Sequence, residues 1–106
     1  MFKVAAVFFL FLTTTALADE IDNIRGRCVA QWPDKYSMQE FCIKQQENSL
    51  TTVLSFYHGE ASTGKMRKIM VSCMEDWGLP EEKADWHMIE FCYKQELDSY
   101  RTLSGN

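Results

Sequence analysis

Apolar residues beyond position 20 recur at steps of three and four, in four stretches separated by short breaks. This spacing places side chains on one face of an α-helix, and no stretch shows the alternation of a strand. The pattern therefore predicts an all-α protein. The four stripes are Ile21, Ile24, Cys28 and Trp32; Met38, Phe41, Cys42, Val53 and Phe56; Met66, Ile69, Met70, Cys73 and Trp77; and Met88, Phe91, Cys92 and Leu103.

Proline and glycine mark the three breaks between these stripes. They are Pro33, the Gly-, Ser- and Thr-rich linker 58–64, and the segment 78–80. A residue before proline avoids helical backbone, and clusters of Gly, Ser and Thr favour loops. Ser37 stands three residues before Glu40 and so matches the capping-box pattern of a helix start, whereas a start nearer Pro33 would place Ser37 inside the helix. We expect four helices, the last of them from about residue 85 to 103.

Two copies of one motif account for the four stripes. Residues 28–32 and 73–77 share Cys-x-x-x-Trp, 45 positions apart. Residues 36–45 and 86–95 share Met-x-Glu-Phe-Cys-x-Lys-Gln, 50 positions apart. The change in spacing places five additional residues in the second copy. Chance is a poor explanation for two such motifs in so short a chain, and the sequence therefore predicts two repeats of one helical hairpin.

The repeats, residues 19–57 and 63–104, each contain two of the four cysteines. Parity alone allows three pairings, but autonomous repeats would form Cys28–Cys42 and Cys73–Cys92, and cross-unit bridges are the alternative. The chain lacks Cys-x-x-Cys, which argues against redox catalysis or thiolate metal binding. The expected fold is two disulfide-stapled helical hairpins packed as a small four-helix bundle, in a single domain.

The first eighteen residues have the features of a secretory signal peptide. Lys3 is followed by nine apolar residues, 4–12, and Ala16-Leu17-Ala18 supplies the small residues that signal peptidase requires. Nine helical residues span about 14 Å, too little for a membrane anchor in a hydrocarbon core of about 30 Å. Cleavage before Asp19 would leave residues 19–106 in the periplasm or outside the cell, where disulfides persist.

The composition of the chain excludes some classes of partner but does not indicate an activity. The chain has 106 residues, 46% of them hydrophobic, and a formal net charge of −4. The leader contains only one of the positive charges, so the exported part is more acidic still. An acidic surface argues against nucleic acid and anionic membranes as partners. Another protein is the expected partner, and no cofactor is expected.

Four polar or aromatic residues are candidate contacts for that partner. Gln45 and Gln95 occupy equivalent positions, followed in the same register by Ser49 and Ser99, and they continue the apolar stripes. They either bond a neighbouring helix or line a binding groove. Tyr93 and Tyr100, seven residues apart, are expected to form an exposed stripe of the kind found at protein interfaces.

Two further clusters have simpler explanations than catalysis or metal binding. Met66, Met70 and Met74 stand at four-residue steps and suggest a Cu(I) site, but a core stripe is favoured because methionine fills irregular gaps. Glu40–Lys44 and Glu90–Lys94 are spaced as helix-surface salt bridges rather than as catalytic carboxylates. No catalytic residue is predicted.

The duplicated motif, Cys-x-x-x-Trp followed by Met-x-Glu-Phe-Cys-x-Lys-Gln, resembles that of small uncharacterised exported proteins from bacteria and phages. The resemblance covers most of the chain after the leader and implies no activity. Size, export and helical disulfides are also similar in class to periplasmic inhibitor and immunity proteins. We therefore expect a non-enzymatic protein-binding module, with a periplasmic small-ligand or copper-binding protein as the alternative.

Overall fold

The computed structural model describes residues 14–105 of the chain, and they are almost entirely helical. The order along the chain is α2 (Thr14–Gln31), α3 (Tyr36–His58), α4 (Gly64–Trp77), the 3₁₀ helix η1 (Glu81–Lys83) and α5 (Trp86–Leu103). No strand is present in residues 14–105. The predicted all-α class is confirmed.

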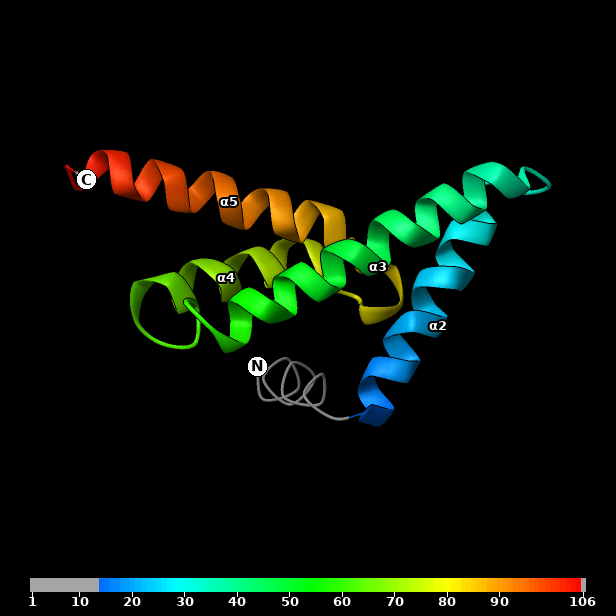
Figure 1. The fold of residues 1–106 in the computed structure, drawn as a ribbon, viewed down its shortest axis with the longest axis horizontal. Coiled ribbons are helices and arrows are strands. Elements are labelled where there is room, and N and C mark those ends of the chain that lie inside the picture. Colours follow the sequence, from blue (N-terminus) through cyan, green and yellow to red (C-terminus); the bar gives the residue numbers. More distant parts are fainter. Residues whose placement is uncertain (1–13, 106) are drawn as a thin grey trace.

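The helices form two hairpins, α2 with α3 and α4 with α5. The two long helices α3 and α5 lie side by side and share the most extensive contact of the fold. They run in the same direction, and α4 runs back along α5 in the opposite direction (Figure 1). In the same view, α2 leans away from α3. The two hairpins therefore stack as repeats of one unit, with their second helices in contact.

Each hairpin is closed by one disulfide. Cys28 bonds Cys42 and Cys73 bonds Cys92, with Cα–Cα distances of 5.7 and 5.8 Å. These are the pairs expected for autonomous repeats, and the prediction is confirmed. Both bridges lie near the corner of their hairpin. They fix the same pair of helical turns in each repeat.

The core lies where α5 packs against α3. Four apolar residues of α5 are buried, at steps of three and four: Trp86, Ile89, Tyr93 and Leu97. The buried residues of α3 are Cys42, Gln46, Ser49, Leu50, Val53 and Tyr57. The rings of Phe56 and Tyr93 are 5.0 Å apart across this contact. The second helices of the two repeats therefore bury apolar surface against each other, in addition to the apolar contacts within each hairpin.

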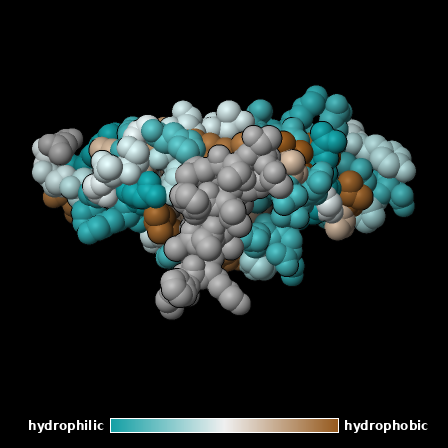
Figure 2. All heavy atoms as spheres, turned by 90° about the horizontal axis from the view of Figure 1, so that it is seen from below, coloured by the Kyte–Doolittle hydropathy of each residue, from teal (hydrophilic) through white to brown (hydrophobic). Residues whose placement is uncertain are grey.

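Several residues of the predicted stripes lie at the surface instead. Phe41 and its repeat equivalent Phe91 are 61% and 52% exposed, and Trp77 is 43% exposed. In α5 the predicted stripe lies one helical position from the buried face, and in α3 the exposed Phe41 lies beside buried Cys42. In α2 and α4 the predicted Ile24, Cys28, Met70 and Cys73 are buried. On the face drawn in Figure 2, apolar residues form small separate patches among hydrophilic ones.

The helix ends differ from the expected caps. Lys35, not Ser37, precedes α3, and it makes no side-chain cap bond, so the capping box is wrong. Asp85 caps α5 by accepting a hydrogen bond from the Met88 N–H. Gly78 ends α4, where an added Cβ would lie 2.4 Å from the Met74 carbonyl oxygen. Glycine is therefore required for this tight exit from the helix.

Most of the predicted signal peptide lies outside the described residues. The part that is described, Thr14–Ala18, continues α2 as helix. None of the helices within residues 14–105 combines the length and apolar character needed to cross a bilayer.

Candidate functional site

Trp86 joins the two hairpins at their centre. Its indole Nε1–H donates a hydrogen bond of 2.7 Å to Oε2 of Glu20, which lies near the start of α2. Trp86 is 0% and Glu20 2% exposed. The residue at the beginning of α5 therefore reaches the first helix of the other hairpin.

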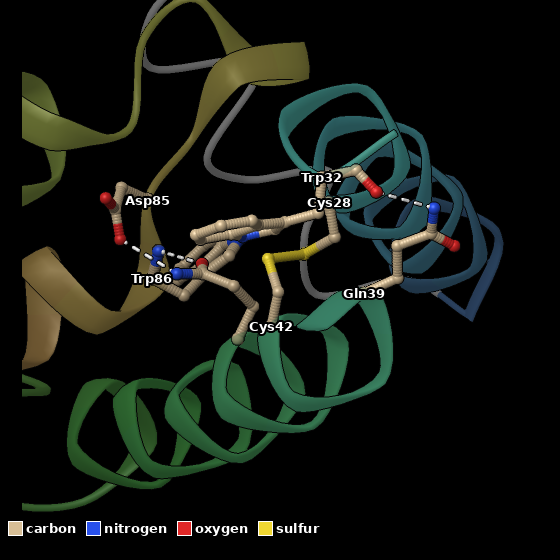
Figure 3. Close-up of a disulfide and its surroundings, with 7 residues drawn as sticks. Cys28, Trp32, Gln39, Cys42, Asp85 and Trp86 are labelled. Carbon is tan, nitrogen blue, oxygen red and sulfur yellow. Dashed lines mark hydrogen bonds between the residues drawn. A yellow bond between two sulfur atoms is a disulfide. The ribbon is translucent and has the colours of Figure 1, made fainter. Parts of the chain in front are cut away.

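The side chain of Gln46, on α3, binds the backbone at the start of α5. Its Oε1 accepts the Trp86 backbone N–H at 2.7 Å, and its Nε2 donates to Oδ1 of Asp85 at 2.9 Å. That oxygen also accepts the Met88 N–H at 3.1 Å. Figure 3 shows Trp86 near the Cys28–Cys42 disulfide, with the bonds that Gln46 makes to Asp85 and to the Trp86 N–H dashed. One buried amide thus fixes the start of α5 against the first repeat.

Glu20 is a carboxyl group in an unfavourable place for charge. Burial raises its pKa from 4.5 to about 7, and the nearby Glu81 contributes in the same direction. The hydrogen bond from Trp86 and the positive charge of Arg27 lower the pKa but do not offset burial. Glu20 therefore changes protonation close to neutral pH.

A groove opens beside this corner, at the junction of α2, α3 and the start of α5. Its cavity has a volume of about 210 Å³. Polar and apolar side chains line it in similar number: Arg27, Gln31, Trp32, Met38, Phe41, Cys42, Gln45, Gln46, Asp85, His87 and Met88. The exposed Phe41 and the half-buried Trp32 give the groove an aromatic rim.

Arg27 gives the groove its distinctive chemistry. The Nε and Nη2 atoms of its guanidinium are buried, and they have no hydrogen-bond partner in the described structure. These two N–H groups share one edge of the guanidinium, the edge that binds a carboxylate with two parallel hydrogen bonds. Buried donors of this kind are rare because each lost bond costs about 1–3 kcal/mol. Arg27, which lines the groove, therefore has an unpaired carboxylate-binding edge buried beside it.

Other polar groups of the groove are already bonded or lie near its rim, so the Arg27 edge is its main binding group. Asp85 is the acidic residue of the lining, and its Oδ1 already accepts from Gln46 and Met88. Cys42 is in a disulfide. Gln45 and His87 add hydrogen-bonding capacity near the rim. The arrangement suits a single carboxylate with an apolar stem, held between Arg27 and the aromatic rim.

The predicted partner-binding residues are not brought together. Gln45 is half-buried and lines the groove, whereas Gln95 is exposed on the second hairpin. Tyr93 is 0% exposed, which corrects the expected tyrosine stripe; its hydroxyl donates to Oε2 of Glu60 at 2.7 Å. Burial and the Glu60 carboxylate raise the pKa of Tyr93. Tyr100 remains at the surface, 38% exposed.

The serines that follow these glutamines also differ between the repeats. Ser49 is buried at 3% exposure in the contact between α3 and α5, whereas Ser99 is exposed. The expected polar continuation of the apolar stripe is therefore found in the first repeat alone.

The methionine cluster belongs to the core. Met70 and Met74 are fully buried in the core and Met66 packs against it, as expected for a core stripe. Within residues 14–105, no group of three or more His, Cys, Asp or Glu side chains is placed to hold a metal ion.

The glutamate–lysine pairs form the expected salt bridges. Lys44 lies 3.2 Å from Glu40, and Lys94 lies 2.6 Å from Glu90. The pKa of Glu90 is lowered: burial raises it, but hydrogen bonds from Lys94 and Ser49 outweigh that effect.

Comparison with known proteins adds no identification: no family model, no curated protein and no solved structure matches the chain. The site is therefore interpreted from its own geometry.

Sequence reasoning missed Glu20, Arg27, Gln46 and Trp86. Gln46 follows the candidate contact Gln45 by one position, and Trp86 stands at the position equivalent to Tyr36 in the two repeats. One signal was present in the sequence. Arg27 and Gln46 have Ser72 and Glu96 as repeat equivalents, so the repeats differ at the residues that make the groove specific.

Proposed function

We propose that this chain is an exported, non-enzymatic binding protein whose groove receives a carboxylate from a protein partner. The carboxylate is an acidic side chain or a C-terminal carboxyl group. The observation that supports this most directly is the buried, unpaired Nε–Nη2 edge of Arg27. Rotation of the Arg27 side chain into the cavity that it lines would present this edge to the partner.

The size of the groove favours a protein partner over a free small molecule. Sites for drug-sized ligands occupy about 300–1,000 Å³, and this cavity measures about 210 Å³. It has room for one inserted side chain. Exposed Phe41 and half-buried Trp32 at the rim supply the aromatic surface typical of protein-interaction hot spots. An inhibitor or immunity-type role fits such a surface.

The chemistry of the lining supports binding rather than catalysis. The sulfur of Cys42 is in a disulfide, and Asp85 serves as a helix cap. Export is supported by the two disulfides, which suit an oxidising compartment, and by the leader-like first eighteen residues. The partner would then be met in the periplasm or outside the cell.

Selection from a displayed library of random peptides tests this function. Peptides that bind the wild-type protein should be enriched in Asp, Glu or a free C-terminal carboxyl group. Arg27→Gln should lose that enrichment, because the amide cannot form the bidentate pair. Selected peptides without any acidic preference would contradict the proposal.

Two matched controls separate the groove from the rest of the surface. Arg25 lies on the same helix, is exposed, and is 3.7 Å from Glu47, so Arg25→Gln should leave selection unchanged. Phe91 is the repeat equivalent of Phe41 and similarly exposed, but it does not line the groove. Phe41→Ala should weaken the selected peptides, and Phe91→Ala should not.

A further inference from the structure

Each hairpin contributes one helix face to the contact between the two hairpins. The equivalent face of the other hairpin has no partner hairpin within residues 14–105. Within the chain, α5 inserts one face, marked by Trp86 and Tyr93, against the face of α3 marked by Gln46 and Leu50. Since the repeats are equivalent at a spacing of 50 positions, α3 has its own inserting face and α5 its own receiving face. The inserting face of α3 is Tyr36, Gln39, Ile43 and Glu47, and the receiving face of α5 is Glu96, Ser99, Tyr100 and Leu103.

Both open faces are accessible in part. Tyr36, the equivalent of Trp86, is 73% exposed, and Leu103, the equivalent of Val53, is 88% exposed. Tyr100, the equivalent of buried Leu50, is 38% exposed. On the α3 face, Ile43 packs partly against the core and Glu47 lies 3.7 Å from Arg25, so the most exposed point of this face is Tyr36.

The two helix starts have the same shape. Lys35 precedes α3 with φ −114° and ψ 82°, and Asp85 precedes α5 with φ −112° and ψ 95°. Each is followed by an aromatic residue, Tyr36 or Trp86. The Lys35–Tyr36 corner can therefore present itself to a receiving face in the way that the Asp85–Trp86 corner does.

The receiving face of α5 also has a cavity in the corresponding place. The cavity has a volume of about 410 Å³ and lies beside the Cys73–Cys92 disulfide. Four of its lining residues are the repeat equivalents of residues that line the groove of the first hairpin: Ser72, Asp76, Cys92 and Glu96 correspond to Arg27, Gln31, Cys42 and Gln46. The second repeat thus has open space beside its disulfide, at residues equivalent to those that line the groove of the first repeat.

The charges at the two open faces are complementary. In the internal contact, Gln46 pairs with the Asp85 carboxylate. At the open positions, Glu96 replaces Gln46 and Lys35 replaces Asp85, so an amide–carboxylate pair becomes a carboxylate–ammonium pair. Asp76 in place of Gln31 adds a second negative charge to the cavity. One side of the contact has thus changed from neutral to negative, and the other from negative to positive.

A second polar contact has a counterpart as well. The Ser49 hydroxyl bonds the Glu90 carboxylate between α3 and α5. Their repeat equivalents are Ser99 and Glu40, both exposed. The same pair can therefore form between two chains.

We propose that the open faces bind each other in separate copies of this chain, so that α5 of one copy receives the Lys35–Tyr36 corner and α3 of a second copy. The contact is head-to-tail, because the two surfaces are different, and each added copy leaves one open face of each kind. It continues the internal stacking of the repeats from one molecule to the next.

This contact should be weaker than the internal one. The second hairpin has a longer corner, and its η1 segment packs against α2. The first corner lacks the additional residues, so the contact between copies has no equivalent of that packing. Assembly should therefore depend on concentration.

Analytical ultracentrifugation of the protein, expressed with its own leader and purified after secretion, tests the proposal. The weight-average mass should rise from micromolar to millimolar protein without stopping at a dimer. Glu96→Lys and Lys35→Glu should each weaken association at least about tenfold, because each places like charges in contact. An equimolar mixture of the two variants should associate again, because each then meets an opposite charge.

Asp98→Lys is the matched control. It makes the same charge reversal on α5, but its repeat equivalent Asn48 is exposed and lies outside the internal contact. This variant should associate like the wild type. A wild-type monomer at all concentrations, a closed dimer, or a variant mixture that fails to associate would each overturn the proposal.

Discussion

The Trp86 indole donates a 2.7 Å hydrogen bond to Glu20, and both side chains are buried. The bond joins the start of α5 to the start of α2, across 66 positions of the chain. It crosses from one disulfide-closed hairpin to the other. Together with Gln46, it makes the Trp86 corner the main polar link between the repeats.

Stability should decrease as pH rises through the range where only unfolded Glu20 ionises. Burial raises the folded pKa from 4.5 to about 7, so the folded chain retains a proton that the unfolded chain releases. The free energy of unfolding should fall between pH 4.5 and 7 by up to about 3 kcal/mol and level off above. Glu20→Gln should lack this decrease.

Urea unfolding of both proteins between pH 4 and 8 measures this effect. The informative quantity is the difference between wild type and Glu20→Gln, since other groups contribute equally to both. The variant should gain relative stability toward pH 8. Parallel curves would show that Glu20 has an ordinary pKa.

Gln46→Ala should be far more damaging than Gln45→Ala. Gln46 accepts the Trp86 N–H and donates to Asp85, and its loss should cost about 2–3 kcal/mol. Gln45 lines the groove without such a bond among the described contacts, and its loss should cost less than about 0.5 kcal/mol. Equal losses in urea unfolding would contradict the role of Gln46.

The amide of Trp86 gives a local check on that result. Hydrogen exchange at this N–H should accelerate in Gln46→Ala and remain slow in Gln45→Ala. A variant that is merely destabilised throughout would accelerate all core amides together.

The two disulfides should contribute unequally despite their equivalent positions. The bonded cysteines are separated by 14 and 19 residues, for which loop closure predicts about 3 kcal/mol each. Replacing Cys28 and Cys42 by Ala should cost more, because the Trp86 corner packs beside that bridge. Replacing Cys73 and Cys92 should cost only the loop term. A larger loss from the second pair would contradict this assignment.

Replacing Met66, Met70 and Met74 by Leu should leave metal binding unchanged. Met70 and Met74 are core residues, and Leu has a similar volume, so each substitution should cost less than about 1.5 kcal/mol. Titration of the wild type and the triple variant with Cu(I) checks this. Stoichiometric copper binding that the variant loses would support the copper alternative.

The duplication made the covalent framework predictable. Cys28, Cys42, Cys73 and Cys92 recur at equivalent positions, so one argument about a hairpin applied twice. The helix breaks were equally local, since Pro33 and Gly78 act through their own backbone. These features could be predicted because they depend on residues that are close together in the sequence.

The site depends on contacts that a periodic pattern does not contain. Trp86, Glu20 and Gln46 come from three different helices, and their hydrogen bonds follow from how the hairpins stack. The apolar pattern also allows two adjacent faces of α5 to be the buried one. The face of Phe91 was predicted to be buried, whereas the structure buries the face of Tyr93.

The most direct test of the binding function is an NMR titration with a minimal carboxylate probe. N-acetylglutamate N-methylamide should shift the amide signals of Gln45, Gln46 and His87 at millimolar concentration, whereas the matching glutamine compound should not. Arg27→Gln should abolish the shifts, and Arg25→Gln should retain them. Equal shifts with both compounds, or shifts that persist in Arg27→Gln, would contradict a carboxylate-binding groove.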